Sequence, residues 1–196
     1  PGQCMPDRWP PDPGMPGCIN AVIGLSNEIG FPNVSMSKIA KRAGISSSTL
    51  YVYFENKEDM FRKVYTEVKI RMEQECARDI SSWETIEQSV KQICKNALQY
   101  IQNYTDEFLF IEQSCNSPFV TREMLDEIDR HSREIVEIFE RGIAEGILKQ
   151  TSPILLISFC YYPIQQIFKE CQKPNSMLPD TDFNLVFQMC WDAIRR

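Results

Sequence analysis

Side chains that carry hydroxyl groups gather between positions 47 and 53 of this 196-residue chain. A hydroxyl can hydrogen-bond a phosphate oxygen or the edge of a nucleic-acid base, and a tyrosine ring can also pack against sugars and thymine methyl groups. Lysines nearby would add attraction to phosphates, and a lysine at a helix start could hold one phosphate together with the first amide groups of the helix. We therefore predict a DNA-binding surface made of Ser35, Lys38, Ser47, Ser48, Thr49, Tyr51, Tyr53 and Lys57.

Several of these residues also have a purely structural interpretation. Tyr51 and Tyr53 could be partly buried core aromatics, because a tyrosine can bury its ring and keep its hydroxyl at the surface. Lys38 and its neighbour Lys41 could belong to an ordinary solvated helix face. Both interpretations stay open for these residues.

An enzymatic function is the first alternative, and the residue types argue against it. The only histidine, His131, lies in a charged stretch, and no nucleophile motif accompanies it. The eight cysteines form no Cys-x-x-Cys pair, so we expect buried free thiols in a reducing cytoplasm rather than a zinc site or a disulfide framework. We predict no catalytic residue, no metal and no cofactor.

Two short helices that meet at a tight turn are needed to present the hydroxyl-bearing stretch. Ser35 is a good N-cap for a helix that runs to about Arg42, and Ser46 can cap a helix over 47–54. Gly44 can supply the positive φ of the turn between them. Apolar residues that would pack the two helices together are Ile39, Ala40, Ala43, Ile45, Leu50 and Phe54. This arrangement is the helix-turn-helix pattern.

The rest of the chain predicts further helices and no strands. Apolar spacing indicates a helix over 18–29 and a long helix from Asn56 toward Ile80. More helices are expected at 83–104, 106–115, 119–148, 153–171 and 180–195. Six prolines and three glycines in residues 1–17 predict an irregular arm. We predict an all-α fold of about nine helices, with a three-helix helix-turn-helix domain at 18–62 and a larger helical bundle at 63–196.

The helix-turn-helix stretch resembles the DNA-binding segment of the TetR family of bacterial regulators. The matching residues are Ser35, Ile39-Ala40, Ala43-Gly44-Ile45-Ser46, Leu50-Tyr51, Tyr53-Phe54 and Lys57-Glu58. Gly142 and Gly146 also lie in a segment common late in this family, whereas Ser48 stands where the family usually has glycine. The resemblance implies a repressor whose third helix lies in the major groove of operator DNA and which a small apolar or aromatic inducer releases.

The resemblance also implies a homodimer made by the last two helices. A two-fold operator needs two recognition helices roughly 34–36 Å apart, and the last two helices carry apolar stripes that could form a four-helix interface. The same stripes could instead bury core within one chain. The predicted interface residues are Phe159, Ile164, Ile167, Phe168, Phe183, Val186, Phe187, Cys190 and Ile194.

An inducer pocket inside the C-terminal domain is the third implication. Such a pocket would be mostly apolar with a few polar handles, and Glu112, Gln113 and Gln165 could be these handles. The predicted lining residues are Tyr100, Tyr104, Phe108, Glu112, Phe139 and Tyr162. An aromatic stripe at helical spacing is more often core than pocket, so that interpretation stays open.

The charge distribution keeps one further alternative open. The net charge is −6, although a DNA-binding protein is more usually basic. The first 57 residues carry five basic and four acidic residues, whereas the remainder carries 16 basic and 23 acidic ones. The alternative is a ligand-binding or interaction protein with the TetR fold but without DNA binding. No span of about 20 apolar residues exists, so we expect a cytoplasmic protein with no membrane partner.

Overall fold

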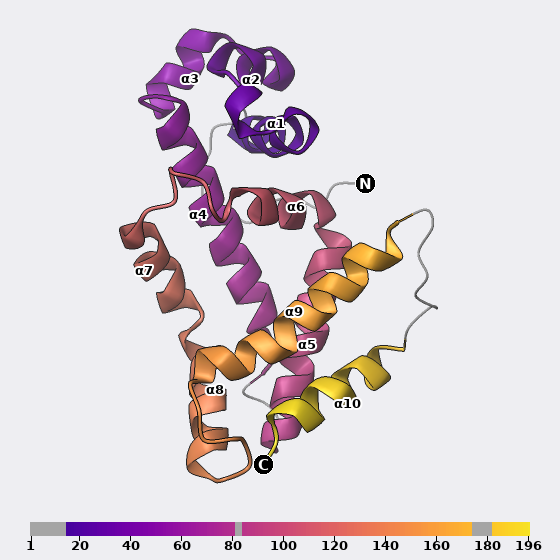
Figure 1. Cartoon of the computed structure of the whole chain (residues 1–196). Coiled ribbons are helices and arrows are strands. Elements are labelled where there is room, and N and C mark those ends of the chain that lie inside the picture. Colours follow the sequence, from indigo (N-terminus) through magenta and orange to yellow (C-terminus); the bar gives the residue numbers. More distant parts are fainter. Residues whose placement is uncertain (1–14, 81–83, 174–181) are drawn as a thin grey trace. The chain divides into compact units, whose positions relative to one another are not determined.

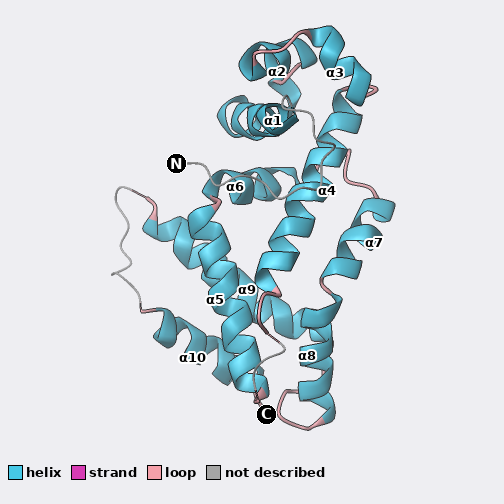
Figure 2. Cartoon of the chain, turned by 180° about the vertical axis from the view of Figure 1, so that it is seen from behind, coloured by secondary structure: helices cyan, strands magenta, loops and turns pink. Residues whose placement is uncertain are grey.

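Helices build the described part of the chain. The computed structural model describes residues 15–80, 84–173 and 182–196, and these residues form ten α-helices, one 3-10 helix and no strand (Figure 1; Figure 2). The predicted all-α class is confirmed. The helices are α1 (Met15–Ile29), η1 (Phe31–Asn33), α2 (Met36–Ala43), α3 (Ser47–Tyr53), α4 (Lys57–Cys76), α5 (Ile86–Asn103), α6 (Thr105–Ser114), α7 (Arg122–His131), α8 (Arg133–Ala144), α9 (Pro153–Cys171) and α10 (Phe183–Ile194).

Two of the predicted helices need correction. The region 119–148, predicted as one helix, forms α7 and α8, which are separated at Ser132, where φ is −91° and ψ is 1°. The Ser132 hydroxyl donates a 3.0 Å hydrogen bond to the Asp129 carbonyl, and such a local bond competes with helical geometry. The first helix begins at Met15 rather than at residue 18, because a proline in the first turn has no helical amide bond to lose.

Two further helices begin a few residues later than predicted. The helix predicted from residue 83 begins at Ile86, because Thr85 and Gln88 form a capping box at its start. The helix predicted from residue 180 begins after its cap, Asp182. Residues 1–14 of the predicted arm, Trp83 and positions 180–181 lie outside the described residues.

The chain divides into two compact units. Unit 1 contains the described residues up to Lys69 together with Asp106–Leu125, and unit 2 contains Ile70–Thr105 and Asp126–Arg196. The chain therefore crosses from one unit to the other three times. The predicted functional boundary at residues 62 and 63 stays a prediction, and the compact units have different bounds because α6 and the loop after it belong to unit 1.

An aromatic cluster holds the distant segment of unit 1 in place. The Phe119 ring centroid lies 4.9 Å from that of Phe31 and 5.5 Å from that of Phe61. The Phe110 centroid lies 6.2 Å from that of Phe61, and Tyr65 contacts both Phe110 and Phe119. Aromatic pairs at these separations add to the stabilisation that burial gives. Unit 1 therefore depends on residues far apart in the sequence.

In unit 2, helix α5 packs against α8, α9 and α10. Four buried thiols lie close together in this core: Cys76, Cys94, Cys160 and Cys190. A hydrogen bond between Cys94 and Cys160, together with burial, raises the pKa of the Cys94 thiol well above its usual range. Burial likewise raises the pKa of Cys190 to about 11. The thiols of Cys94 and Cys190 therefore stay protonated at neutral pH. Cys115 and Cys171 are exposed, which corrects the expectation that all cysteines are buried.

Gly142 of α8 gives a test of this packing. A Cβ at this position would lie 2.7 Å from Leu148 Cδ1 and 2.9 Å from Ile86 Cγ2, and both neighbours are buried. We expect Gly142→Ala to lower the free energy of unfolding by about 1–3 kcal/mol, because an overpacked core must distort. Thermal unfolding should show a decrease of about 2–4 °C in Tm for each kcal/mol lost.

Gly24→Ala is the matched control for this substitution. A Cβ at Gly24, inside α1, would meet nothing closer than 3.7 Å. Alanine is favoured over glycine in a helix by up to about 1 kcal/mol, so Tm should stay level or rise. A Gly142→Ala protein that melted above the native protein would show that α8 and its neighbours can separate easily.

Candidate nucleic-acid interface

Local sequence chemistry positions the helix-turn-helix. The Ser35 hydroxyl accepts a 3.4 Å hydrogen bond from the Lys38 amide at the start of α2, and the Ser46 hydroxyl accepts one of 3.1 Å from the Thr49 amide at the start of α3. Gly44 has φ 70° and ψ 26°, the left-handed conformation that glycine adopts without strain. Both predicted caps and the predicted turn are confirmed.

Helix α3 has one buried side and one solvent side. Leu50 is fully buried, and Phe54 just after the helix is buried as well. Tyr51 is 57% exposed and Val52 is 76% exposed, while Ser47 and Ser48 are also on the surface. Thr49 and Tyr53 are half-buried. The solvent side of α3 therefore presents short hydroxyls, a phenol and one apolar side chain.

Hydrogen bonds within the helix start restrain part of this hydroxyl set. The Ser46 hydroxyl lies 2.7 Å from that of Ser48 and 2.8 Å from that of Thr49. Ser48 and Thr49 therefore help to fix the cap of α3. Ser47 takes no part in these bonds and lies at the edge of a neighbouring groove.

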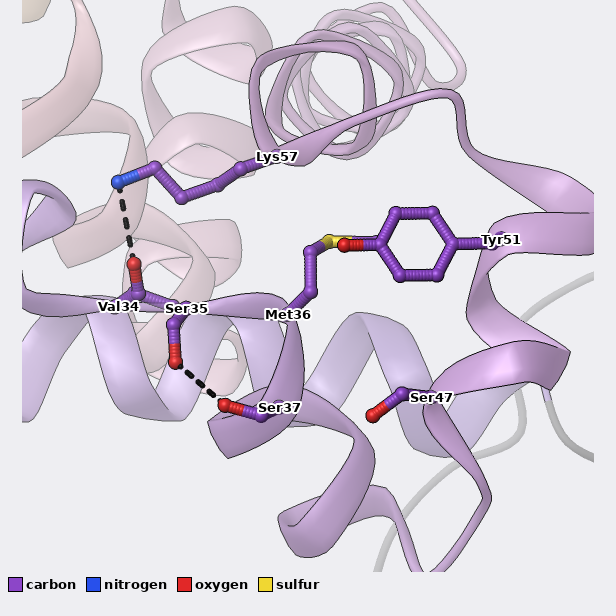
Figure 3. A pocket seen from close by; sticks show the side chains of 7 residues that line it. All are labelled: Val34, Ser35, Met36, Ser37, Ser47, Tyr51 and Lys57. Carbon is purple, nitrogen blue, oxygen red and sulfur yellow. Dashed lines mark hydrogen bonds between the residues drawn. The ribbon is translucent and has the colours of Figure 1, made fainter.

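A groove joins the starts of α2, α3 and α4. Its volume is about 410 Å³, and Figure 3 shows the side chains around it: Val34, Ser35, Met36, Ser37, Ser47, Tyr51 and Lys57. In this view the Tyr51 ring reaches toward Met36, and the Ser35 and Ser37 hydroxyls are 3.1 Å apart. The structure thus brings together Ser35, Ser47, Tyr51 and Lys57, four of the eight predicted residues.

Lys57 makes bonds inside the protein at the edge of this groove. Its ammonium donates to the Phe31 carbonyl at 3.1 Å and to the Val34 carbonyl at 3.2 Å, and it lies 4.2 Å from the Phe31 ring centroid. These contacts fix the η1 segment that leads into α2. The Lys38 ammonium likewise donates to the Asn33 carbonyl at 2.9 Å. The phosphate contacts of both lysines stay predictions.

Three groove or surface residues were missed by the sequence reasoning. Met36 and Ser37 line the groove, and Val52 is the most exposed of the large apolar side chains. Helical spacing was the available indication, because Val52 lies four residues after Ser48 and hence on the same face. Val52 carries neither a hydroxyl nor a charge, but an apolar side chain can also contact a thymine methyl group.

One of the basic side chains at the end of α2 forms an ion pair within the protein. Arg42 binds Glu28 through two hydrogen bonds of 2.6 Å each, which joins α2 to α1. The Arg42 hydrogen bond holds the pKa of the Glu28 carboxyl below its usual range. Arg42 is therefore engaged within the protein, whereas the neighbouring Lys41 is exposed.

The predicted pocket residues fall into both units. Phe108 and Glu112 belong to unit 1, and Tyr100, Tyr104, Phe139 and Tyr162 belong to unit 2. Tyr100, Phe108 and Phe139 are buried, and Tyr104 and Glu112 are half-buried. Tyr162 is 60% exposed, and the lining role of these six residues stays a prediction.

The predicted dimer residues differ in their exposure within the single chain. Phe159 is 51% exposed. Ile167, Phe168 and Phe183 are half-buried. These three residues and Val186 line a cavity of about 240 Å³ between α5, α9 and α10. The predicted interface residues that unit 2 buries in its own core are Ile164, Val186, Phe187, Cys190 and Ile194. The contact of these residues with a second subunit stays a prediction.

Metal ligands do not cluster in the described ranges. Within residues 15–80, 84–173 and 182–196, no three histidine, cysteine, aspartate or glutamate side chains are grouped so that they could hold a metal ion. Across the same ranges, no helix combines the length and the apolar character that crossing a membrane requires.

An all-α chain with a capped helix-turn-helix and an exposed recognition helix defines a helix-turn-helix DNA-binding protein. The family model described as bacterial regulatory proteins of the tetR family matches residues 19–64, and the model described as the Tetracyclin repressor-like C-terminal domain matches residues 65–196. The chain belongs to the TetR family and is a DNA-binding transcriptional regulator. The resemblance drawn from residues 35–58 is confirmed.

Individual relatives support the same assignment. The fatty acid metabolism regulator protein of Bacillus subtilis (strain 168) is 25% identical over 134 residues, which cover 67% of this chain and 69% of that protein. A TetR family transcription regulator from Marinobacter aquaeolei VT8 has a similar structure, with a TM-score of 0.85, 22% identity and coverage of 93% and 95% of the two chains. The transcriptional regulator FadR from Bacillus subtilis, in complex with stearoyl-CoA, has a TM-score of 0.69, 19% identity and coverage of 92% and 99%.

Proposed function

We propose that this protein is a cytoplasmic repressor that binds a two-fold operator as a homodimer and leaves it when an acyl ligand binds unit 2. The observation that carries the DNA-binding part is the solvent side of α3 beside the groove of Ser35, Ser47 and Tyr51. Short hydroxyls and Val52 let the α3 backbone come close to a major groove, where a phenol and a methyl group can contact base edges.

An exposed apolar face supports the homodimer. We call it the α9–α10 face, and its residues are Ile154, Leu155, Phe159, Tyr162, Leu185 and Met189. Leu155, Phe159 and Tyr162 are four and three residues apart, so they share one side of α9, as Leu185 and Met189 share one side of α10. Helices α9 and α10 pack on each other. Exposed patches of this kind mark interaction sites, and a second copy would give a four-helix contact.

Two relatives and the character of unit 2 support an acyl ligand. One relative is named a fatty acid metabolism regulator, and a structural neighbour holds stearoyl-CoA. Apolar and aromatic side chains fill unit 2, including Tyr100 and Phe139. An acyl chain is the kind of ligand that an apolar interior takes up with little need for polar partners.

Binding to the protein's own promoter region tests this function. Fluorescence anisotropy with a promoter fragment should show specific binding that weakens steeply with salt, because phosphate contacts release counterions. Stearoyl-CoA should reverse the binding and coenzyme A alone should not. Absence of DNA binding at low salt by a well-folded dimer would favour the alternative of a TetR-fold protein without DNA binding. DNA binding that no acyl compound reverses would refute the ligand part only.

A further inference from the structure

A buried amide without a partner lies in unit 2. Gln165, near the middle of α9, is 4% exposed, and its Nε2 atom has no hydrogen-bond partner among the described residues. A buried N–H donor that is left unpaired costs free energy, so native structures rarely keep one without a reason. A ligand that supplies an acceptor oxygen would give such a reason.

Contacts on either side of Gln165 show which helices surround it. The Tyr161 hydroxyl lies 3.6 Å from the Met72 sulfur of α4, and Gln165 follows Tyr161 by one turn on the same face. Ile164, the preceding residue, lines the small cavity together with Leu98 of α5. Gln165 therefore lies on a stretch of α9 whose neighbouring residues contact α4 and share a cavity with α5.

Arg71, next to Met72 in α4, has polar neighbours at the C-terminal end of α5. The guanidinium of Arg71, the residue before Met72, lies 5.1 Å from the Tyr104 ring centroid. The Tyr104 and Tyr100 rings are 5.2 Å apart, and burial raises the pKa of the Tyr100 hydroxyl well above its usual range. Tyr100 therefore remains a neutral hydroxyl. These groups bring one cation and neutral hydrogen-bonding groups to a unit whose buried side chains are mostly apolar.

We propose that the Gln165 amide donates a hydrogen bond to the acyl carbonyl oxygen of the ligand, and that Arg71 and Tyr100 recognise the same polar end. This inference rests on the proposed function and names the part of the ligand that unit 2 recognises. The carbonyl could belong to a thioester or to a free carboxylate. Arg71 would add attraction for the carboxylate only, because a thioester carbonyl has no charge.

Gln165→Leu is the variant that tests the inference. The substitution removes the unpaired donor but keeps a similar volume, so the ligand-free protein should keep its Tm or melt slightly higher. Binding of stearoyl-CoA, measured by calorimetry on the full chain, should weaken about five- to tenfold, as expected for one lost hydrogen bond. Operator affinity without ligand should not change. Gln166→Leu, the same exchange at the exposed neighbour, should leave both affinities unchanged.

Stearate beside stearoyl-CoA separates the two sources of the carbonyl. If Gln165→Leu binds both probes more weakly than the native protein, the result supports recognition of the shared carbonyl. If it binds only one probe more weakly, the result supports recognition of that form alone. Unchanged affinity for both probes in Gln165→Leu would overturn the inference while leaving the proposed function intact. A decrease of several degrees in Tm would also overturn it, because the amide would then have a structural partner. Failure of the native protein to bind either probe would overturn the inference together with the ligand part of the proposed function.

Discussion

Replacing Ser47 with aspartate is expected to weaken operator binding strongly and leave the fold intact. Ser47 is exposed, occupies the first turn of α3 and borders the groove beside Tyr51. A carboxylate in a first helical turn is stabilising by about 0.3–1 kcal/mol, so Tm should stay level or rise. On a surface that faces DNA phosphates the same charge repels. We expect the free energy of operator binding to weaken by about 2 kcal/mol for each recognition helix. This corresponds to roughly thirtyfold in affinity per half-site, which an anisotropy titration can measure.

Gln88→Glu is the matched control for this experiment. Gln88 is exposed in the first turn of α5 in unit 2, and a glutamate can keep its place in the capping box. The control adds the same charge at a comparable helix position, so a nonspecific effect of net charge would appear in both variants. Ser47→Ala separates the loss of the hydroxyl from the added charge. Operator binding by Ser47→Asp at the native affinity would show that the start of α3 does not face DNA.

Replacing Phe159 with glutamate is expected to separate the homodimer and thereby remove operator binding. Phe159 is 51% exposed in the single chain and lies in the middle of the α9 part of the α9–α10 face. In a dimer the glutamate would be buried without a partner, which costs about 3–5 kcal/mol. We expect a dimer dissociation constant raised by two to three orders of magnitude. Sedimentation at micromolar concentration should then show monomer.

Ile147→Glu controls for exposed apolar side chains in general. Ile147 is 38% exposed, lies between α8 and α9 and is not one of the residues of the α9–α10 face. This variant should remain dimeric and bind the operator as the native protein does. A dimeric Phe159→Glu protein, with Ile147→Glu monomeric, would move the interface to another surface. Circular dichroism of each variant separates loss of the dimer from unfolding.

Features set by a few neighbouring residues could be predicted from the sequence. Ser35, Gly44 and Ser46 act through hydrogen bonds or backbone freedom within three residues of their own position. Their roles therefore do not depend on the rest of the fold. The buried positions of Leu50 and Phe54 followed from the spacing of apolar residues on short helices whose ends were already known.

Features that depend on distant contacts could not be predicted in this way. Helix α10 is apolar on both sides, so its periodicity did not show that Val186 and Phe187 face inward while Leu185 and Met189 face solvent. The break at Ser132 has no glycine or proline to announce it. Nor does local sequence indicate that Lys57 bonds the carbonyls of Phe31 and Val34, because η1 and α4 approach each other only in the folded unit.

The three chain crossings between the units limit how this protein can be cut or recombined. A fragment that stops at residue 69 would lose Phe110 and Phe119, and the rings of Phe31, Phe61 and Tyr65 would lose their covering. We therefore do not expect such a fragment to fold as an independent unit when it is joined to another protein. A hybrid regulator that joins this DNA-binding unit to a foreign sensor would have to bring α6 and Phe119 along, or replace the ring cluster with polar side chains. The DNA-binding unit of this protein is therefore complete only when the chain has passed through unit 2 and returned with α6 and Phe119.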